Sequence, residues 1–284
     1  MILVADSGSS KTDWIITSVN ADPIEFTTKG INPFFVSEKE IAKIIAQKTE
    51  IKNNLDKIDE VHFFGEGCTS PDKREIVSNA LSTVLKNAFI NVETDTLGSV
   101  YATCGDSKGF TCVLGTSSSV AFYDGAEVSA STHGLGFILG DEGSGSDLGK
   151  RLLTSFLYGR MPGALKRKFQ AEYSLTKDLI ITNVYQRQLP NLYLSSFSQF
   201  LSSNRGNPFV EELLDEAFQA FVDTNLAPYS YYQSYPCHFV GSVAYFFKDV
   251  LETVCLKNKL KLGKVLRQPV RDIAEFIIRQ NEAV

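Results

Sequence analysis

Residues 1–16, which read MILVADSGSSKTDWII, contain the strongest indication of the fold. An apolar run at residues 2–5 leads into a turn of small and hydroxyl-bearing residues, and residues 13–16 return to an apolar pattern. This arrangement predicts a strand, a tight turn and a second strand. It differs from the strand–loop–helix phosphate-binding loop, because the residues after the turn alternate with the period of a strand.

The turn at residues 6–12 has a composition that suits phosphate. Small residues let a phosphate group approach the main chain, whose N–H groups can then hold it. Lys11 adds a positive charge, and Asp6 at the strand end is a candidate ligand of a metal ion, directly or through water. An ordinary polar hairpin turn is the alternative interpretation.

Length and composition limit the classes of function. A chain of 284 residues predicts two domains, and 43% apolar with 21% charged residues is typical of a soluble globular protein. A net charge of −5 without a basic run argues against nucleic-acid binding. No apolar run is long enough for a bilayer and no signal-peptide pattern opens the chain, so we expect no membrane association and a cytoplasmic location.

The cysteines give a weaker indication. They are five, an odd number, and none stands in CxxC spacing. We therefore expect reduced thiols, with a metal or cluster role as the alternative. They are Cys68, Cys104, Cys112, Cys237 and Cys255.

Alternating strand and helix patterns follow the first turn. In the first hundred residues we predict strands at 1–6, 13–19, 23–29, 61–64 and 89–92 and helices at 38–54, from Pro71 onward, and at 95–104. In the remainder we predict strands at 110–114, 120–123, 126–130, 237–240 and 261–266 and helices at 242–256 and 269–280, with residues 145–226 mainly helical.

The opening pattern returns about one hundred residues later. A strand at 110–114 leads into the small, hydroxyl-rich turn 115–119, GTSSS, and another strand follows. Two copies of strand, small turn and strand indicate a duplicated domain. We therefore predict an N-terminal domain at 1–105, on which residues 269–284 pack, and a C-terminal domain at 106–268 with a helical insertion at about 145–226.

Four features in this chain order resemble the actin, sugar kinase and Hsp70 superfamily. They are the first turn, Asp95 at a strand-to-helix junction, the second turn, and residues 240–244, VGSVA. Within the superfamily, residues 134–144, GLGFILGDEGS, are similar to the glycine-rich run of the N-acetylglucosamine kinase and BadF/BadG/BcrA/BcrD ATPase family. The resemblance spans nearly the whole chain.

The resemblance implies an α/β fold of two actin-like (ribonuclease H-like) domains, each with a mixed five-stranded sheet flanked by helices, and a cleft between them. It also implies ATP and Mg²⁺ as cofactors, with the metal held by Asp6. The two turns match the phosphate-1 and phosphate-2 loops, and residues 240–244 match the adenosine motif. The residues that we expect to bind ATP are Ser7, Gly8, Ser9, Ser10, Lys11, Thr12, Gly115, Thr116, Ser117, Gly241 and Ser242.

Phosphoryl transfer also needs a carboxylate that positions the acceptor hydroxyl. Asp95 matches the family aspartate that accepts the hydroxyl proton, whereas a plain helix N-cap is the alternative role for an aspartate at this position. Asp141 suits a polyol because a carboxylate can accept two hydroxyls, and Glu142 has a possible role in reaching magnesium through water. The residues that we expect to bind the sugar are Asn32, Thr116, Ser117, Ser119, Gly134 and Asp141.

Three functions follow from these features. The first is an ATP-dependent kinase, a dimer in the resembled family, that phosphorylates a hydroxyl of an amino sugar such as N-acetylglucosamine. The second is a BadF-type ATPase that activates a partner reductase through an iron–sulfur cluster, for which Cys104 and Cys112 are the nearest candidates. The third is a non-catalytic sugar or nucleotide sensor on the same fold.

Overall fold

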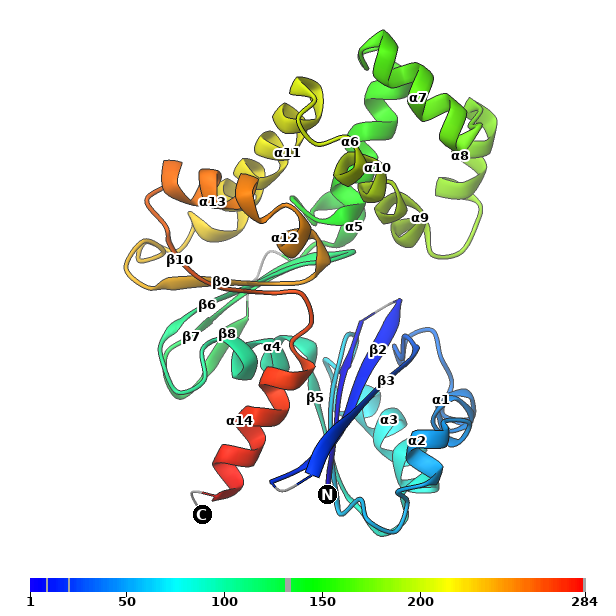
Figure 1. The fold of residues 1–284 in the computed structure, drawn as a ribbon, viewed down its shortest axis with the longest axis vertical. Helices are drawn as coiled ribbons and strands as arrows, with labels where there is room; N and C mark the ends of the chain where they lie inside the picture. The colour runs from blue at the N-terminus through cyan, green and yellow to red at the C-terminus, as the bar shows by residue number, and fades with distance from the viewer. Residues whose placement is uncertain (9, 20, 131–133, 283–284) are drawn as a thin grey trace. The chain divides into compact units, whose positions relative to one another are not determined.

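The chain folds into two compact units, each built around one sheet (Figure 1). The computed structural model describes residues 1–8, 10–19, 21–130 and 134–282. Unit 1 comprises Met1–Ser107, Gly125–Val128 and Gln268–Val284, and unit 2 comprises Lys108–Asp124 and Ser129–Arg267.

The sheet of unit 1 has five strands in the order β3-β2-β1-β4-β5. The central strand β1 pairs antiparallel with β2 and parallel with β4, which in turn pairs parallel with β5. The carboxyl ends of β1, β4 and β5 therefore meet at one edge of the sheet. The strands are β1 (Ile2–Ser7), β2 (Lys11–Ser18), β3 (Ala21–Lys29), β4 (Glu60–Gly65) and β5 (Phe89–Thr94).

Helices cover both faces of this sheet (Figure 1). On one face Trp14 stacks on Phe26, in a core shared with the buried residues of the helices α1 and α3. On the other face α4 packs on α14, where Tyr101 stacks on Phe276. The helices of unit 1 are α1 (Glu38–Ala46), α2 (Thr49–Lys52), α3 (Pro71–Val84), α4 (Asp95–Thr103) and α14 (Val270–Glu282).

The predicted helix at 38–54 is wrong in its length. Its chain is divided between α1 and α2, because Lys48 adopts an extended backbone with ψ of 125°. Ile51 nevertheless stays buried, as the helical spacing required. The chain thus keeps its apolar face on the core while it changes direction.

The sheet of unit 2 has the order β10-β9-β6-β7-β8, and its central strand β6 pairs antiparallel with β7 and parallel with β9. This is the arrangement of unit 1 repeated, so the predicted fold class of two mixed five-stranded sheets flanked by helices is confirmed. The strands are β6 (Gly109–Leu114), β7 (Ser118–Tyr123), β8 (Val128–Ala130), β9 (Pro236–Val240) and β10 (Lys261–Leu266).

Unit 2 buries an aromatic-rich core between its sheet and helices, which includes Phe110, Phe218 and Phe239. The predicted helix at 242–256 is interrupted at Phe247, which separates α12 from α13. The helical elements are α5 (Gly136–Leu139), α6 (Gly145–Leu157), α7 (Gly163–Tyr173), α8 (Lys177–Tyr185), α9 (Pro190–Ser196), α10 (Ser198–Ser203), α11 (Pro208–Phe221), the π-helical turn η1 (Val222–Leu226), α12 (Ser242–Phe246) and α13 (Lys248–Lys257).

Among the residues that the structure describes, none of the helices combines the length and the apolar character needed to cross a membrane.

Candidate active site

The first turn connects β1 to β2 and is held by its own hydroxyl groups. Gly8 donates its N–H to the carbonyl oxygen of Lys11 at 3.0 Å. The hydroxyl oxygens of Ser7 and Thr12 lie 2.7 Å apart, and Ser7 also donates to the Ile31 carbonyl at 3.0 Å. Ser7 and Thr12 are fully buried, so their side chains fasten the turn to the chain after β3 and leave phosphate contacts to the backbone.

The other predicted residues of this turn differ in their surroundings. Ser10 is exposed, and Ser9 lies outside the described residues. Lys11 forms an ion pair with Asp13, with 2.9 Å between Nζ and Oδ2. Gln268 donates to the same carboxylate at 3.2 Å. The Lys11 ammonium is half-exposed while it pairs, so it can exchange this partner for a phosphate oxygen.

Three carboxylates follow the parallel strands of unit 1. Asp6 lies at the end of β1, Glu66 follows β4, and Asp95 follows β5. Burial, together with the negative charges of Asp95 and Asp13, raises the pKa of Asp6 to about 8. Carboxylates that repel one another in this way favour a cation or a transferable proton beside them.

Asp95 is the first residue of α4, and its side chain is not the helix cap. Thr94 is the N-cap and accepts a hydrogen bond from the Leu97 N–H at 3.3 Å. Burial raises the pKa of Asp95 to about 6, with a contribution from the charge of Glu66. A carboxylate with a pKa near neutrality is suited to accept a proton and release it again.

The donor set of unit 1 fits a magnesium ion that keeps most of its water. Within the described ranges, no three side chains of His, Cys, Asp or Glu are arranged to hold a metal together. Mg²⁺ often binds through one or two carboxylates plus water and phosphate oxygens. Asp6, with its pKa raised by burial and by neighbouring negative charge, is the residue that would hold it.

Asn32 is buried after the end of β3. Its side-chain oxygen accepts the N–H of Phe34 at 3.0 Å, which makes a local turn around Pro33. Gly67 packs directly on this amide, because a Cβ at position 67 would overlap Asn32 Oδ1. The side chain of Asn32 is therefore held in one place.

The second turn, Gly115–Ser117, joins β6 to β7 and is held from two sides. The first N–H groups of α6 bind it: Gly145 donates to the Gly115 carbonyl at 2.8 Å and Ser146 to the Thr116 carbonyl at 3.1 Å. Gly241, with φ of +120°, lies against the backbone of Leu114, and a Cβ there would overlap its carbonyl oxygen. Gly241 also begins α12, where Ser242 is exposed.

The backbone of the second turn keeps donors for a ligand. In the described part of the chain, the N–H groups of Thr116 and Ser117 make no hydrogen bond with another group. Both residues are half-exposed. Two such N–H groups and two hydroxyls can bind an anion or a polyol.

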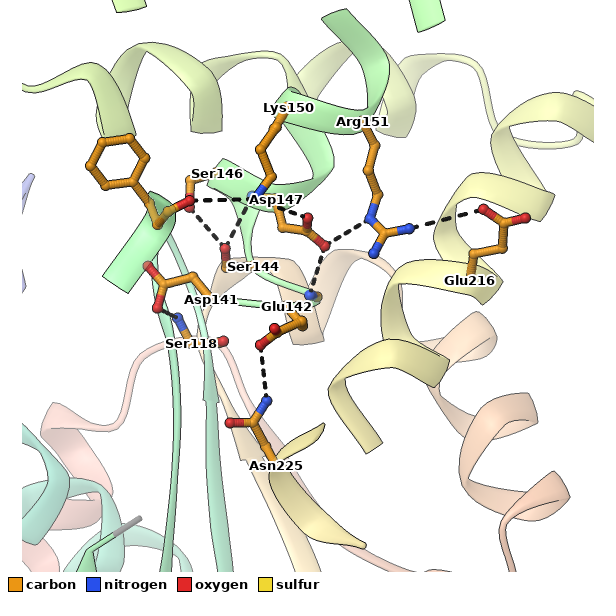
Figure 2. Close-up of polar contacts among 12 residues, drawn as sticks. Ser118, Asp141, Glu142, Ser144, Ser146, Asp147, Lys150, Arg151, Glu216 and Asn225 are labelled. Carbon is orange, nitrogen blue, oxygen red and sulfur yellow. Dashed lines mark hydrogen bonds and ion pairs between the residues drawn. The ribbon is translucent and has the colours of Figure 1, made fainter. Parts of the chain in front are cut away.

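Asp141 lies beside the start of β7 (Figure 2). Its carboxylate accepts the N–H of Ser118 at 3.3 Å, and the residue has a left-handed backbone with φ of 58°. The buried hydroxyl of Ser118 has no hydrogen-bond partner among the described residues. Ser119 is the next residue of the strand, so its side chain points to the opposite face of the sheet. Gly134 is exposed and directly follows the undescribed residues 131–133.

Comparison with known proteins gives the family. No protein-family model and no curated protein matches the chain. A crystal structure from Porphyromonas gingivalis, of a protein provisionally named N-acetylglucosamine kinase, is 39% identical, with a TM-score of 0.94 over 99% of this chain and 100% of that one. The chain belongs to the family of this protein.

Two more distant structures share the fold. A protein from Chromobacterium violaceum, also provisionally named N-acetylglucosamine kinase, is 16% identical with a TM-score of 0.72, and each chain is 98% covered. A ROK family glucokinase from Streptomyces griseus, solved with glucose and AMPPNP, is 12% identical with a TM-score of 0.62 over 98% of this chain and 99% of that one. The chain therefore has the actin-like fold of sugar kinases.

All five cysteines are buried, and in the described structure none forms a disulfide. Burial raises the pKa of the Cys68 and Cys255 thiols to about 12, so at neutral pH these two remain uncharged. Neither is prepared for ligation of a metal as a thiolate.

Sequence reasoning missed two residues near Asp141. Ser118 was treated as part of the turn, although it begins β7 and carries the N–H that Asp141 accepts. Asn225, in the π-helical turn, donates to Glu142 at 3.3 Å. Because its partner is 83 positions away in the chain, no local pattern marks it.

Proposed function

We propose that the protein is an ATP-dependent kinase that phosphorylates a hydroxyl of an amino sugar such as N-acetylglucosamine. The observation that carries the proposal is the environment of Asp95. This carboxylate begins a helix at the carboxyl end of a parallel strand, beside Glu66, and its pKa of about 6 suits a proton acceptor.

Within this proposal the reaction is a direct transfer. The acceptor hydroxyl oxygen forms a bond to the γ-phosphorus of ATP while the bond from that phosphorus to the β-phosphate oxygen breaks. Asp95 takes the hydroxyl proton. Mg²⁺, when bound beside Asp6, neutralises charge on the phosphate oxygens. The N–H groups of Thr116 and Ser117 supply phosphate-binding donors.

The nucleoside has a candidate pocket in unit 2. A cavity of about 230 Å³ lies between α10 and α12, next to the Gly241 turn that resembles the adenosine motif. Apolar rings and polar side chains both line it, which suits a purine base. Its lining residues are Ser198, Gln199, Ser202, Ser242, Val243, Phe246 and Phe247.

The amino sugar is proposed from the family and from two side chains. The Porphyromonas gingivalis relative carries the provisional name of an N-acetylglucosamine kinase. Asp141 lies beside Ser118, whose hydroxyl has no partner among the described residues, and the two offer an acceptor pair for sugar hydroxyls.

The test is coupled ADP release with Mg-ATP against N-acetylglucosamine, glucosamine, N-acetylmannosamine and glucose. We expect one amino sugar to stimulate ADP release strongly, with the sugar phosphate as a stoichiometric product. A steady rate of ATP hydrolysis that no sugar changes would contradict the kinase proposal and favour the ATPase alternative. Binding of a sugar or of ATP without any turnover would favour a sensor.

A further inference from the structure

The helix α11 ends in a π-helical turn that directs one buried amide toward Asp141's loop. In η1 the Ala227 N–H donates to the Val222 carbonyl, five residues back, at 2.9 Å. Such turns are rare and occur frequently at functional sites. Asn225 lies within this turn and is 4% exposed. A buried amide at such a place requires a polar partner.

That partner is Glu142. Asn225 donates from Nδ2 to Glu142 Oε2 at 3.3 Å, across 83 positions of the chain (Figure 2). The same helix end supports the neighbouring glycine: a Cβ on Gly143 would lie 3.0 Å from the Cβ of Phe221. The end of α11 and η1 therefore pack against residues 140–144, through the contacts of Phe221 with Gly143 and of Asn225 with Glu142.

Two residues of this loop have a left-handed backbone: φ is 58° at Asp141 and 71° at Gly143. Glycine adopts this conformation readily. For aspartate it is uncommon, although better tolerated than for most residues, so contacts that hold the loop favour it. Asp147 of α6 holds one side by accepting the Gly143 N–H at 3.1 Å, and Arg151 fixes Asp147 at 2.8 Å. Asn225 holds the other side through Glu142.

We propose that Asn225 is a positioning residue: its bond to Glu142 fixes the 140–144 loop in the conformation that presents the Asp141 carboxylate to the acceptor. The effect on the acceptor rests on the proposed function, in which Asp141 binds the sugar. The effect on the loop does not depend on it. The two parts can therefore be measured separately.

The test reverses the polarity of one hydrogen bond. Asn225→Asp sets a second carboxylate against Glu142, so the pair repels. Glu142→Gln keeps an acceptor oxygen for Asn225. In the double variant E142Q/N225D, the new amide at position 142 donates to the new carboxylate at position 225. Gln219→Glu is the matched control, because it likewise sets two carboxylates against each other, at the exposed pair of Gln219 in α11 and Asp223 in η1.

The direct readout is amide hydrogen exchange of peptides that cover residues 140–146, and it needs no sugar. We expect faster exchange in N225D, recovery in E142Q/N225D, and no change in Q219E. Equal exchange in all four proteins, or an N225D effect that persists unchanged in the E142Q background, would overturn the proposal. If N225D fails to fold, Asn225→Ala removes the bond without added charge: exchange of the 140–146 peptides should then rise above that of wild type and Q219E, and unchanged exchange would overturn the proposal.

The functional readout separates KM from kcat with N-acetylglucosamine as the acceptor. In N225D we expect the sugar KM to rise about tenfold while the KM for ATP stays within about twofold. The double variant should recover most of that loss relative to E142Q. Equal losses in both KM values would contradict a role at the acceptor. If wild-type protein phosphorylates no sugar, the proposed function fails, and the exchange measurement still decides whether Asn225 positions the loop.

Discussion

Gly145 donates its backbone N–H to the carbonyl oxygen of Gly115 at 2.8 Å, and this bond docks the start of α6 on the second turn. The donors at a helix N-terminus are commonly free to bind a ligand. Here two of them, the N–H groups of Gly145 and Ser146, bind the carbonyl oxygens of Gly115 and Thr116. The groups of the second turn that remain for a ligand are its own N–H groups. The N-terminus of α6 therefore serves mainly to make the second turn rigid, and its partial positive charge is less important.

A substitution at Gly241, which packs on the backbone of Leu114 and Gly115, would test whether the second turn must be rigid. An alanine there would meet the Leu114 carbonyl and adopt φ of +120°, so we expect Gly241→Ala to cost about 3 kcal/mol and to raise the KM for ATP. Gly159→Ala is the control, since it has φ of +70° but open space around it. Urea unfolding and ATP kinetics measure both effects. If Gly241→Ala lowers stability and raises the KM for ATP no more than Gly159→Ala does, the close approach of Gly241 to the Leu114 backbone is unimportant.

Asp95→Asn removes the proton acceptor and keeps the shape of the side chain. We expect kcat to fall by about 10²–10⁴-fold, with the Kd for ATP within about twofold of the wild-type value. Stopped-assay product formation and equilibrium nucleotide binding measure the two quantities.

The matched control is Asp72→Asn, because Asp72 also lies in the first turn of a helix that follows a strand of the same sheet. Hydrogen bonding to Ser70 lowers the pKa of Asp72, unlike that of Asp95. We expect this variant to transfer phosphate normally. Near-normal turnover of a folded Asp95→Asn protein would remove Asp95 from its role.

Substitution of Ser118 and of Ser119 would show which of the two serines contacts the sugar. The hydroxyl of Ser118 is buried without a partner in the described structure, so Ser118→Ala should leave stability unchanged or raise it by up to about 1 kcal/mol. The sugar KM should rise about tenfold if that hydroxyl binds the acceptor. We expect Ser119→Ala to change the KM less. The reverse order of the two KM effects would favour the original assignment of Ser119.

This pair also shows why the sequence predicted the turn but not its detail. The apolar alternation and the small residues are local signals, and both strand–turn–strand units follow from them. Whether Ser118 belongs to the turn or to β7 depends on where the strand begins, and an extension of a strand by two residues has no local signature in a run of serines. The predicted strand began at residue 120, whereas the observed strand begins at Ser118.

Helix interruptions were missed for a related reason. The apolar spacing continues through the break at Lys48 and through the π-helical turn, where Val222 and Leu226 keep the spacing of a regular helix and are both fully buried. Hydrophobic periodicity reports which face is buried and is insensitive to one added or displaced backbone bond. By contrast, the start of α11 does have a local signal, because Asn207 caps the helix and Pro208 is its first residue.

His238 gives a prediction for acid stability. Burial, with the nearby charge of Lys264, lowers the pKa of His238 from 6.5 to about 4, and its Nδ1 accepts the Lys264 N–H at 2.9 Å. The unfolded chain therefore binds a proton between these pH values that the folded chain excludes. Stability from the neutral ring is present above pH 6.5 and is lost as the pH falls toward 4.

The variant His238→Asn keeps an acceptor near the Nδ1 position and removes the titration. Between pH 7 and pH 4 we expect the wild-type free energy of unfolding to fall by about 2 kcal/mol more than that of the variant, allowing for solvent that still reaches the ring. Urea unfolding at each pH measures the difference, and NMR titration of the ring gives the pKa directly. A ring that titrates near 6.5, or two parallel stability curves, would mean that the ring is solvated and that Lys264 gains nothing from its neutral form.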